Sequence, residues 1–335
     1  MRTERPELAK IFIDCAKKAR LTTNTCLFPG CDNTSINSHI MQKNGILSSI
    51  SEDRHLWEFN VDHFKKEYFQ FKKTGINEIY TFLGFCNEHD TNLFQKIETQ
   101  GEINFDDYES CALFALRTLC NELWLKLVVK KQHQCILNHS ETISDEVLIN
   151  KVIEQGDIAL KDLKFFEDGL WNDLNNKTES FVFEYREFPR QEICLNSIFT
   201  YDTSEEILNH IKIFGKDKDR LTEIFVSFFP YLDKSILIMG YHKEDTKVAK
   251  PFVNSFMKEN LKRVYRKLSN LIILNCETWV CSPNFYKKKL EGLDSDFFKA
   301  TNFSSKNGNE RRVFDINLFE DNFKNGFKKF IKNIS

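Results

Sequence analysis

Two pairs of residues in the first third of the chain have the types and the spacing of metal ligands. Cys26 and Cys31 are separated by four residues, and Cys86 and His89 are separated by two. Zn²⁺ binds four thiolate or imidazole ligands in a tetrahedron, and short loops commonly supply them two at a time. The turn formers Pro29–Gly30 would let both sulfur atoms of the first pair face one ion. The sequence therefore predicts one structural zinc site built from these four side chains.

His39, between the two pairs, is a fifth candidate ligand. In one assignment the four residues above hold the ion and His39 remains free. In the alternative, His39 replaces one of them, and His89 is the first candidate for replacement. A simpler explanation is that these are ordinary buried cysteines and solvated histidines, since free cysteine is a common core residue. The paired spacing favours the zinc site.

The order of these features resembles treble-clef zinc fingers and, within that group, HNH-type nuclease modules. The shared features are a two-cysteine knuckle, a Ser-His dipeptide, a long insert and a Cys-x-x-His motif at the start of a helix, which together cover residues 26–94. By this resemblance, His39 lies on a β-hairpin and acts as the general base of a metal-dependent endonuclease. The following helix would then supply ligands for a catalytic Mg²⁺, and Asp90 and Asn92 are the residues available for that role.

The sequence departs from the family pattern at two points. Ser38 precedes His39, where the family usually has an Asp or His that binds the catalytic metal, and no second histidine follows His89 on the helix. The alternative is therefore that the module has kept the zinc-binding structure of the family and has lost its nuclease activity. The remainder of the chain resembles uncharacterised bacterial proteins, and that resemblance implies no activity.

The composition is that of an ordinary folded protein. Of the 335 residues, 41% are hydrophobic and 29% are charged, which predicts about two domains and no global disorder. Glycine is scarce, and the chain contains neither a G-x-G-x-x-G motif nor a P-loop, which argues against nucleotide-binding folds. The formal net charge of −2 provides no global basic field, so contact with nucleic acid would need a local patch.

The N-terminal residues are charged and lack the apolar core of a signal peptide. No run approaches the ~20 apolar residues of a membrane span. We therefore expect a cytoplasmic protein without membrane association. In that compartment the ten cysteines would stay reduced, which favours metal ligation over disulfides. Cys111, Cys120 and Cys135 show no ligand pairing and are expected in the core.

Hydrophobic periodicity predicts a largely helical first half and a strand-rich second half. In the first half, helices are expected at 6–20, 40–51, 87–99 and 106–131, strands between 54 and 84, a helical stretch from residue 141 and a polar linker at 172–180. In the second half, strands are expected at 181–185, 193–201, 221–229 and 235–241, and helices at 249–270 and 317–334.

The predicted fold class is α+β, with mostly antiparallel strands. Residues 1–135 are expected to form a zinc-stapled, treble-clef-like module with helices, and residues 136–180 a helical connector and linker. Residues 181–335 are expected to form an antiparallel sheet domain with packing helices. Arg117 and Glu122 interrupt the apolar stripe of the helix at 106–131. A buried network between the two is one alternative, and we expect them on the surface of the helix.

Three hypotheses of function follow. In the first, the zinc is structural and the protein is a binding or assembly component with a protein or nucleic-acid partner. In the second, the chain is an HNH-like endonuclease that uses His39 and Mg²⁺. In the third, chemistry occurs in the second half near His242 and Glu277, in two polar clusters that follow apolar runs. The first ranks highest, because a zinc ion with four protein ligands has no open position for a substrate.

Overall fold

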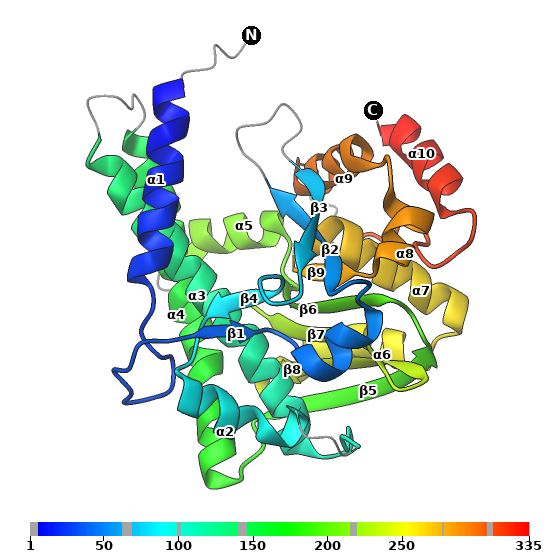
Figure 1. The fold of residues 1–335 in the computed structure, drawn as a ribbon, viewed down its shortest axis with the longest axis horizontal. Coiled ribbons are helices and arrows are strands. Elements are labelled where there is room, and N and C mark those ends of the chain that lie inside the picture. Colours follow the sequence, from blue (N-terminus) through cyan, green and yellow to red (C-terminus); the bar gives the residue numbers. More distant parts are fainter. Residues whose placement is uncertain are drawn as a thin grey trace.

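The computed structural model describes residues 6–61, 69–98, 102–139, 146–214, 220–276, 278–306 and 311–334. Within them, seven strands form one antiparallel sheet, two further strands form a small two-stranded sheet, and helices cover both faces of the large sheet (Figure 1). The predicted mixed fold class with a mostly antiparallel sheet is confirmed.

The large sheet is assembled from segments far apart in the sequence. In their order across it, its strands are β3 (Phe69–Gly75), β2 (His55–Val61), β9 (Trp279–Cys281), β6 (Ile193–Thr200), β7 (Glu223–Tyr231), β8 (Lys234–His242) and β5 (Phe181–Pro189). Every neighbouring pair is antiparallel. The expected strands of the second half are all present, and their runs of β-branched and aromatic residues are typical of strands.

Side chains alternate between two cores along the central strands. On β7, Phe225 and Phe229 pack into a first core on one side of the sheet, whereas Val226 and Phe228 pack into a second core on the other. Successive side chains of a strand point to opposite faces, so a strand that is covered on both faces needs apolar residues at nearly every position. This is why β7 is almost continuously hydrophobic.

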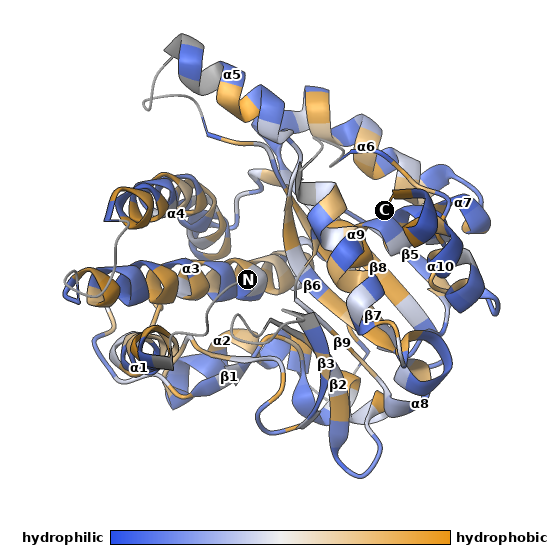
Figure 2. Cartoon of the chain, turned by 90° about the horizontal axis from the view of Figure 1, so that it is seen from above, coloured by the Kyte–Doolittle hydropathy of each residue, from blue (hydrophilic) through white to orange (hydrophobic). Residues whose placement is uncertain are grey.

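Helices fill both sides of the sheet (Figure 2). On one side lie α1 (Pro6–Thr22), α3 (Tyr108–Leu137) and α4 (Glu146–Asn176). On the other lie α6 (Thr246–Lys258), α7 (Leu261–Asn270), α9 (Asp294–Lys306) and α10 (Phe323–Ile334). The other α-helices among the described residues are α2 (Asn87–Glu98), α5 (Ser204–Phe214) and α8 (Pro283–Phe285). Among the described residues, no helix combines the length and the apolarity needed to cross a lipid bilayer.

Several predicted helices differ from the observed ones. The helix expected at 40–51 is a π-helical turn at Lys43–Leu47 followed by a 3-10 turn at Ser48–Ile50. The helix expected at 249–270 is two helices, because Asn260 lies in an extended conformation between them and its side chain caps α7 by accepting from the backbone N–H of Arg263. The C-terminal helix begins at Phe323 rather than at residue 317. The long helix α3 continues to Leu137, beyond the predicted end at 131.

The sheet crosses the expected domain boundary at residue 180. Strands β2 and β3 belong to the insert between His39 and Cys86, yet β2 pairs with β9, where Trp57 is opposite Cys281. This contact places the insert against the second core, with Phe59 and Phe71 beside Trp279. The insert therefore anchors the N-terminal module to the sheet of the second half.

The expectation that all ten cysteines are reduced, with Cys135 unpaired in the core, is wrong. Cys15 of α1 and Cys135 of α3 form a disulfide across a sequence separation of 120 residues, with their Cα atoms 5.6 Å apart. The two residues meet because α1 packs against α3, a contact that sequence spacing does not reveal. The other eight cysteines are free, and Cys111 and Cys120 are buried as expected.

Candidate functional site

The four predicted zinc ligands converge. The Sγ atoms of Cys26, Cys31 and Cys86 and an imidazole nitrogen of His89 all lie within 4.8 Å of one another. Nδ1 of His89 is 3.4 Å from Sγ of Cys26 and 3.3 Å from Sγ of Cys86. With Zn–S near 2.3 Å and Zn–N near 2.0–2.1 Å, a tetrahedral ion would hold its sulfur and nitrogen donors about 3.6 Å apart. Three sulfurs and one imidazole at this spacing fit Zn²⁺.

Local backbone structure explains how the first pair of ligands is presented. The knuckle is a short hairpin in which the N–H of Cys26 donates to the carbonyl of Asn33 and the N–H of Cys31 donates to the carbonyl of Phe28. Gly30 closes the turn with φ +77°, a conformation that glycine adopts without steric cost. Both sulfurs are thereby turned to the same side.

The second pair lies at the start of α2. Cys86 precedes the helix and His89 is in its first turn, so the Cys-x-x-His spacing places both side chains toward the knuckle. The ring of His89 stacks on Phe28, with the ring centroids 3.8 Å apart, which fixes the imidazole orientation. Burial raises the pKa of Cys26 to about 11, whereas a hydrogen bond from the backbone N–H of His89 lowers the pKa of Cys86. A bound cation would offset the cost of a buried thiolate at Cys26.

His39 is not part of this cluster of four donors. It ends β1 (Asn37–His39), which pairs with β4 (Thr81–Leu83), and its Nε2 lies 2.8 Å from the carbonyl oxygen of Ile76. A carbonyl only accepts, so Nε2 carries the proton and Nδ1 of the neutral ring is left as an acceptor. Burial lowers the pKa of His39, which keeps the ring neutral at pH 7.

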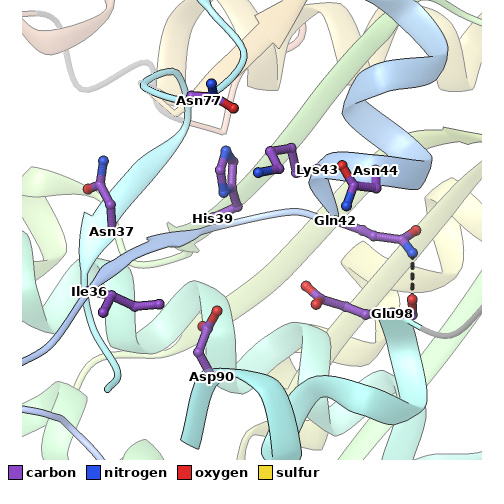
Figure 3. A pocket seen from close by; sticks show the side chains of 9 residues that line it. All are labelled: Ile36, Asn37, His39, Gln42, Lys43, Asn44, Asn77, Asp90 and Glu98. Carbon is purple, nitrogen blue, oxygen red and sulfur yellow. Dashed lines mark hydrogen bonds between the residues drawn. The ribbon is translucent and has the colours of Figure 1, made fainter. Parts of the chain in front are cut away.

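A cavity of about 330 Å³ adjoins His39. It lies between the two-stranded β1–β4 sheet and α2, and Figure 3 shows its side chains facing a common space. The lining residues are Ile36, Asn37, His39, Gln42, Lys43, Asn44, Asn77, Asp90 and Glu98. Two residues that the HNH resemblance singled out, His39 and Asp90, therefore line one pocket. Asn92 is exposed on α2 and is not among the lining residues.

Asp90 is held in an unusual electrostatic environment. Burial raises its pKa, while the nearby Arg117 guanidinium and a hydrogen bond from Ser38 oppose that shift. Its Oδ1 is buried and has no hydrogen-bond partner. Asp90 also lines the cavity, and a carboxylate at a polar cavity is a natural ligand for a hard divalent cation such as Mg²⁺. Ser38 itself is buried and is not among the residues that line the cavity.

Arg117 is a site residue that the sequence reasoning placed incorrectly. It was expected on the surface, but it is only 1% exposed. Every residue from Ser110 to Asn121 on α3 is buried, so this side chain has no route to solvent. Its Nη1 lies 2.5 Å from Oε1 of Glu98 and its Nη2 lies 4.0 Å from Oδ1 of Asp90. The signal that could have found it is a lone arginine in an apolar helical run, because a buried charge requires a partner.

Of the two second-half candidates, the structure describes His242, which takes part in a network of side-chain and backbone contacts. His242 ends β8, and its Nδ1 accepts from the backbone N–H of Glu244 and lies 3.3 Å from Nη2 of Arg220. Arg220 also pairs with Asp245 at 2.6 Å. These contacts hold the turn between β8 and α6. Glu277 lies outside the described residues, so its position relative to His242 is not placed.

Comparisons with protein-family models, with curated proteins and with solved structures find no match for the chain. A functional assignment therefore rests on the geometry of the site itself. That geometry combines a closed cluster of four metal-ligating side chains with a neighbouring pocket that contains a histidine and two carboxylates.

Proposed function

We propose that the chain is a metal-dependent phosphodiesterase acting on nucleic acid, with His39 as its general base and a structural zinc ion at the Cys26 cluster. The observation that carries this proposal is the position of His39. Its ring is outside the zinc-ligand cluster, is oriented by the Ile76 carbonyl and lines a pocket that also contains Asp90. A residue that only maintained the fold would need no cavity beside it.

The zinc site contributes by positioning. Cys26, Cys31, Cys86 and His89 would hold the ion, and a zinc ion with four protein ligands has no open coordination position for a substrate. The cluster ties the knuckle to the first turn of α2, and Asp90 is the residue directly after His89. The cross-link therefore sets where the Asp90 carboxylate lies relative to His39 on β1.

His39 would act on the attacking water. With Nε2–H donated to the Ile76 carbonyl, Nδ1 accepts a proton from water, whose oxygen forms a bond to phosphorus as a P–O ester bond breaks. The carbonyl contact orients the ring and stabilises the imidazolium that forms, as the acceptor beside a catalytic histidine does in other hydrolases. Because burial lowers the pKa of His39, the base is available at neutral pH.

The pocket also contains groups that can bind a phosphate diester. Asp90, which lines the pocket, would be the ligand for Mg²⁺, which when bound supplies Lewis-acid stabilisation of the phosphoryl oxygens. Lys43 lines the pocket, and Nη2 of Arg54 lies 3.4 Å from Oδ1 of Asn77 at its edge. These two cations would bind phosphates that flank the reacting one, so the attraction is local and compatible with the net charge of −2.

The test compares wild type with two single variants on single-stranded and duplex DNA and RNA, with Mg²⁺ or Mn²⁺. We expect cleavage by wild type. His39→Ala should retain one zinc and an unchanged melting temperature while losing at least about 100-fold in rate, the usual contribution of a general base. His133→Ala is the matched control, because His133 lies on α3 with its ring held by the Val129 carbonyl, and it should cleave as wild type does.

Two results would overturn the proposal. One is the absence of cleavage by zinc-loaded wild type on all four substrates with either metal. The other is a folded His39→Ala protein with full activity. Asp90→Asn adds a separate readout, since it should raise the Mg²⁺ concentration needed for half-maximal rate while leaving the zinc content at one per chain.

A further inference from the structure

A second group of metal-ligating side chains lies away from the pocket, where α1 packs on the end of α3. It consists of Cys15 on α1, Cys135 in the last turn of α3 and His139 just beyond that helix. The two sulfur atoms and one imidazole nitrogen lie within 4.8 Å of one another. None of these residues belongs to the zinc cluster or lines the candidate active-site pocket.

We propose that this group is a redox-controlled metal site, which binds a zinc-type ion when its cysteines are reduced and releases it when they form the Cys15–Cys135 disulfide. The two states exclude each other, because a sulfur in a disulfide has no thiolate charge with which to bind a metal. The structure shows the oxidised state, in which Cys15 and Cys135 are disulfide-bonded. On reduction, the same two cysteines and His139 would provide three donors for an ion.

The spacing and burial of the three residues support metal binding. Cys135 and His139 are four residues apart, a spacing that recurs between paired zinc ligands. Cys15 is 2% exposed and sits in a small apolar cluster with Ile136 and Ile149, whereas His139 is exposed. An ion held there would have protein on one side and solvent on the other.

Three protein ligands leave one coordination position for water. This distinguishes the second site from the four-donor cluster at Cys26, which is closed. An ion with an open position exchanges more readily, and Cys135, which is only partly buried, gives an oxidant access to one of its two thiolates. We therefore expect the second ion to bind more weakly and to be lost first on oxidation.

The oxidation step balances with a peroxide as the electron acceptor. Two thiolates and two protons react with one hydrogen peroxide molecule to give the Cys15–Cys135 disulfide and two water molecules, and the metal ion is released. The peroxide O–O bond breaks and the S–S bond forms. A phosphine or thiol reductant reverses the sulfur chemistry and restores the donor set.

The two states differ in which parts of the chain they connect. The disulfide links α1 to α3 through Cys15 and Cys135 alone. The ion would add His139, which follows the end of α3 at Leu137. Oxidation would therefore release His139 while keeping α1 attached to α3.

The experiment titrates the full-length chain with Co²⁺, whose thiolate charge-transfer absorption reports sulfur ligation. Protein reduced with a phosphine should bind two ions per chain, and protein treated with hydrogen peroxide until Cys15 and Cys135 are disulfide-bonded should bind one. His139→Ala is the key variant, because it removes a ligand without touching either sulfur. It should form the disulfide normally, by thiol counting, but weaken the second ion at least about 10-fold.

His133→Ala is the matched control, because His133 lies on α3 close to Cys135 but is not one of the three donors. This variant should bind both ions as wild type does. Binding of a single ion by fully reduced wild type would overturn the proposal. So would an unchanged second affinity in His139→Ala, or peptide mapping of the oxidised protein that finds Cys15 and Cys135 as free thiols. Cys135→Ser, checked for its fold by circular dichroism, should lose both the second ion and the disulfide.

Discussion

Glu223 provides a test of the buried electrostatics of the sheet. It begins β7 opposite Thr200 of β6, and the Thr200 hydroxyl lies 2.9 and 3.0 Å from the two carboxylate oxygens. The residue is only 6% exposed. Burial raises its pKa to about 8, the hydrogen bond from Thr200 opposes the shift, and the nearby carboxylates of Glu122 and Asp162 add to it.

The magnitude follows from the difference between the unfolded and folded pKa values. The unfolded carboxyl titrates near 4.5 and the folded one near 8, and each pKa unit corresponds to 1.36 kcal/mol. Because the folded pKa is raised, the stability contributed by the protonated carboxyl is fully present below pH 4.5 and is lost as the pH rises through 8. The loss is about 3 kcal/mol by pH 7 and approaches ~5 kcal/mol above pH 8.

Glu223→Gln should remove this pH dependence, because an amide cannot ionise and its oxygen can still accept from Thr200. The free energy of unfolding would be measured with urea from pH 5 to 9. Between pH 5 and 8, we expect the value for the variant minus the value for wild type to rise by up to about 1.4 kcal/mol per pH unit. Taking the difference between the two proteins cancels the titration of every other group.

Thr200→Val is the companion variant. It removes the donor that lowers the pKa of Glu223. The free energy of unfolding of this variant should therefore keep falling to a higher pH than that of wild type. Curves for wild type and Glu223→Gln that stay parallel within about 0.5 kcal/mol from pH 5 to 9, the usual size of a neutral substitution, would refute the reasoning.

Two further predictions concern the metal centre and the pocket. Cys86→Ser should lose the structural zinc and lower the melting temperature, because metal binding contributes directly to folding; metal analysis with thermal melts checks this, and a zinc-free wild type with unaltered melting after chelation would contradict it. Arg117→Met should cost about 3 kcal/mol, since it leaves Glu98 and Asp90 without their buried cation. Denaturant titration measures that cost, and a loss below about 1 kcal/mol would show that the two carboxylates are hydrated well enough without it.

Features that depend only on residues close together in the sequence could be predicted from the sequence. The Cys-x-x-His spacing at Cys86 and the Pro-Gly turn before Cys31 identify two ligand pairs because a turn of chain is enough to bring each pair together. The strands of the second half follow from runs such as the one in β7, whose residues suit a sheet covered on both faces. The resemblance to HNH modules pointed to His39 and Asp90, and the structure brings both to one pocket.

The remaining features were decided by tertiary structure, because they depend on contacts between residues distant in the chain. Arg117 looks like a surface residue until residues 110–121 of α3 are seen to be buried all round, and its partner Glu98 comes from another helix. Cys15 meets Cys135 only because α1 packs on α3. The Ile76 carbonyl reaches His39 only because the insert folds back beside β1. Local spacing encodes which side chains can act together within a turn or a helix, whereas the packing of whole elements decides which distant groups share a pocket.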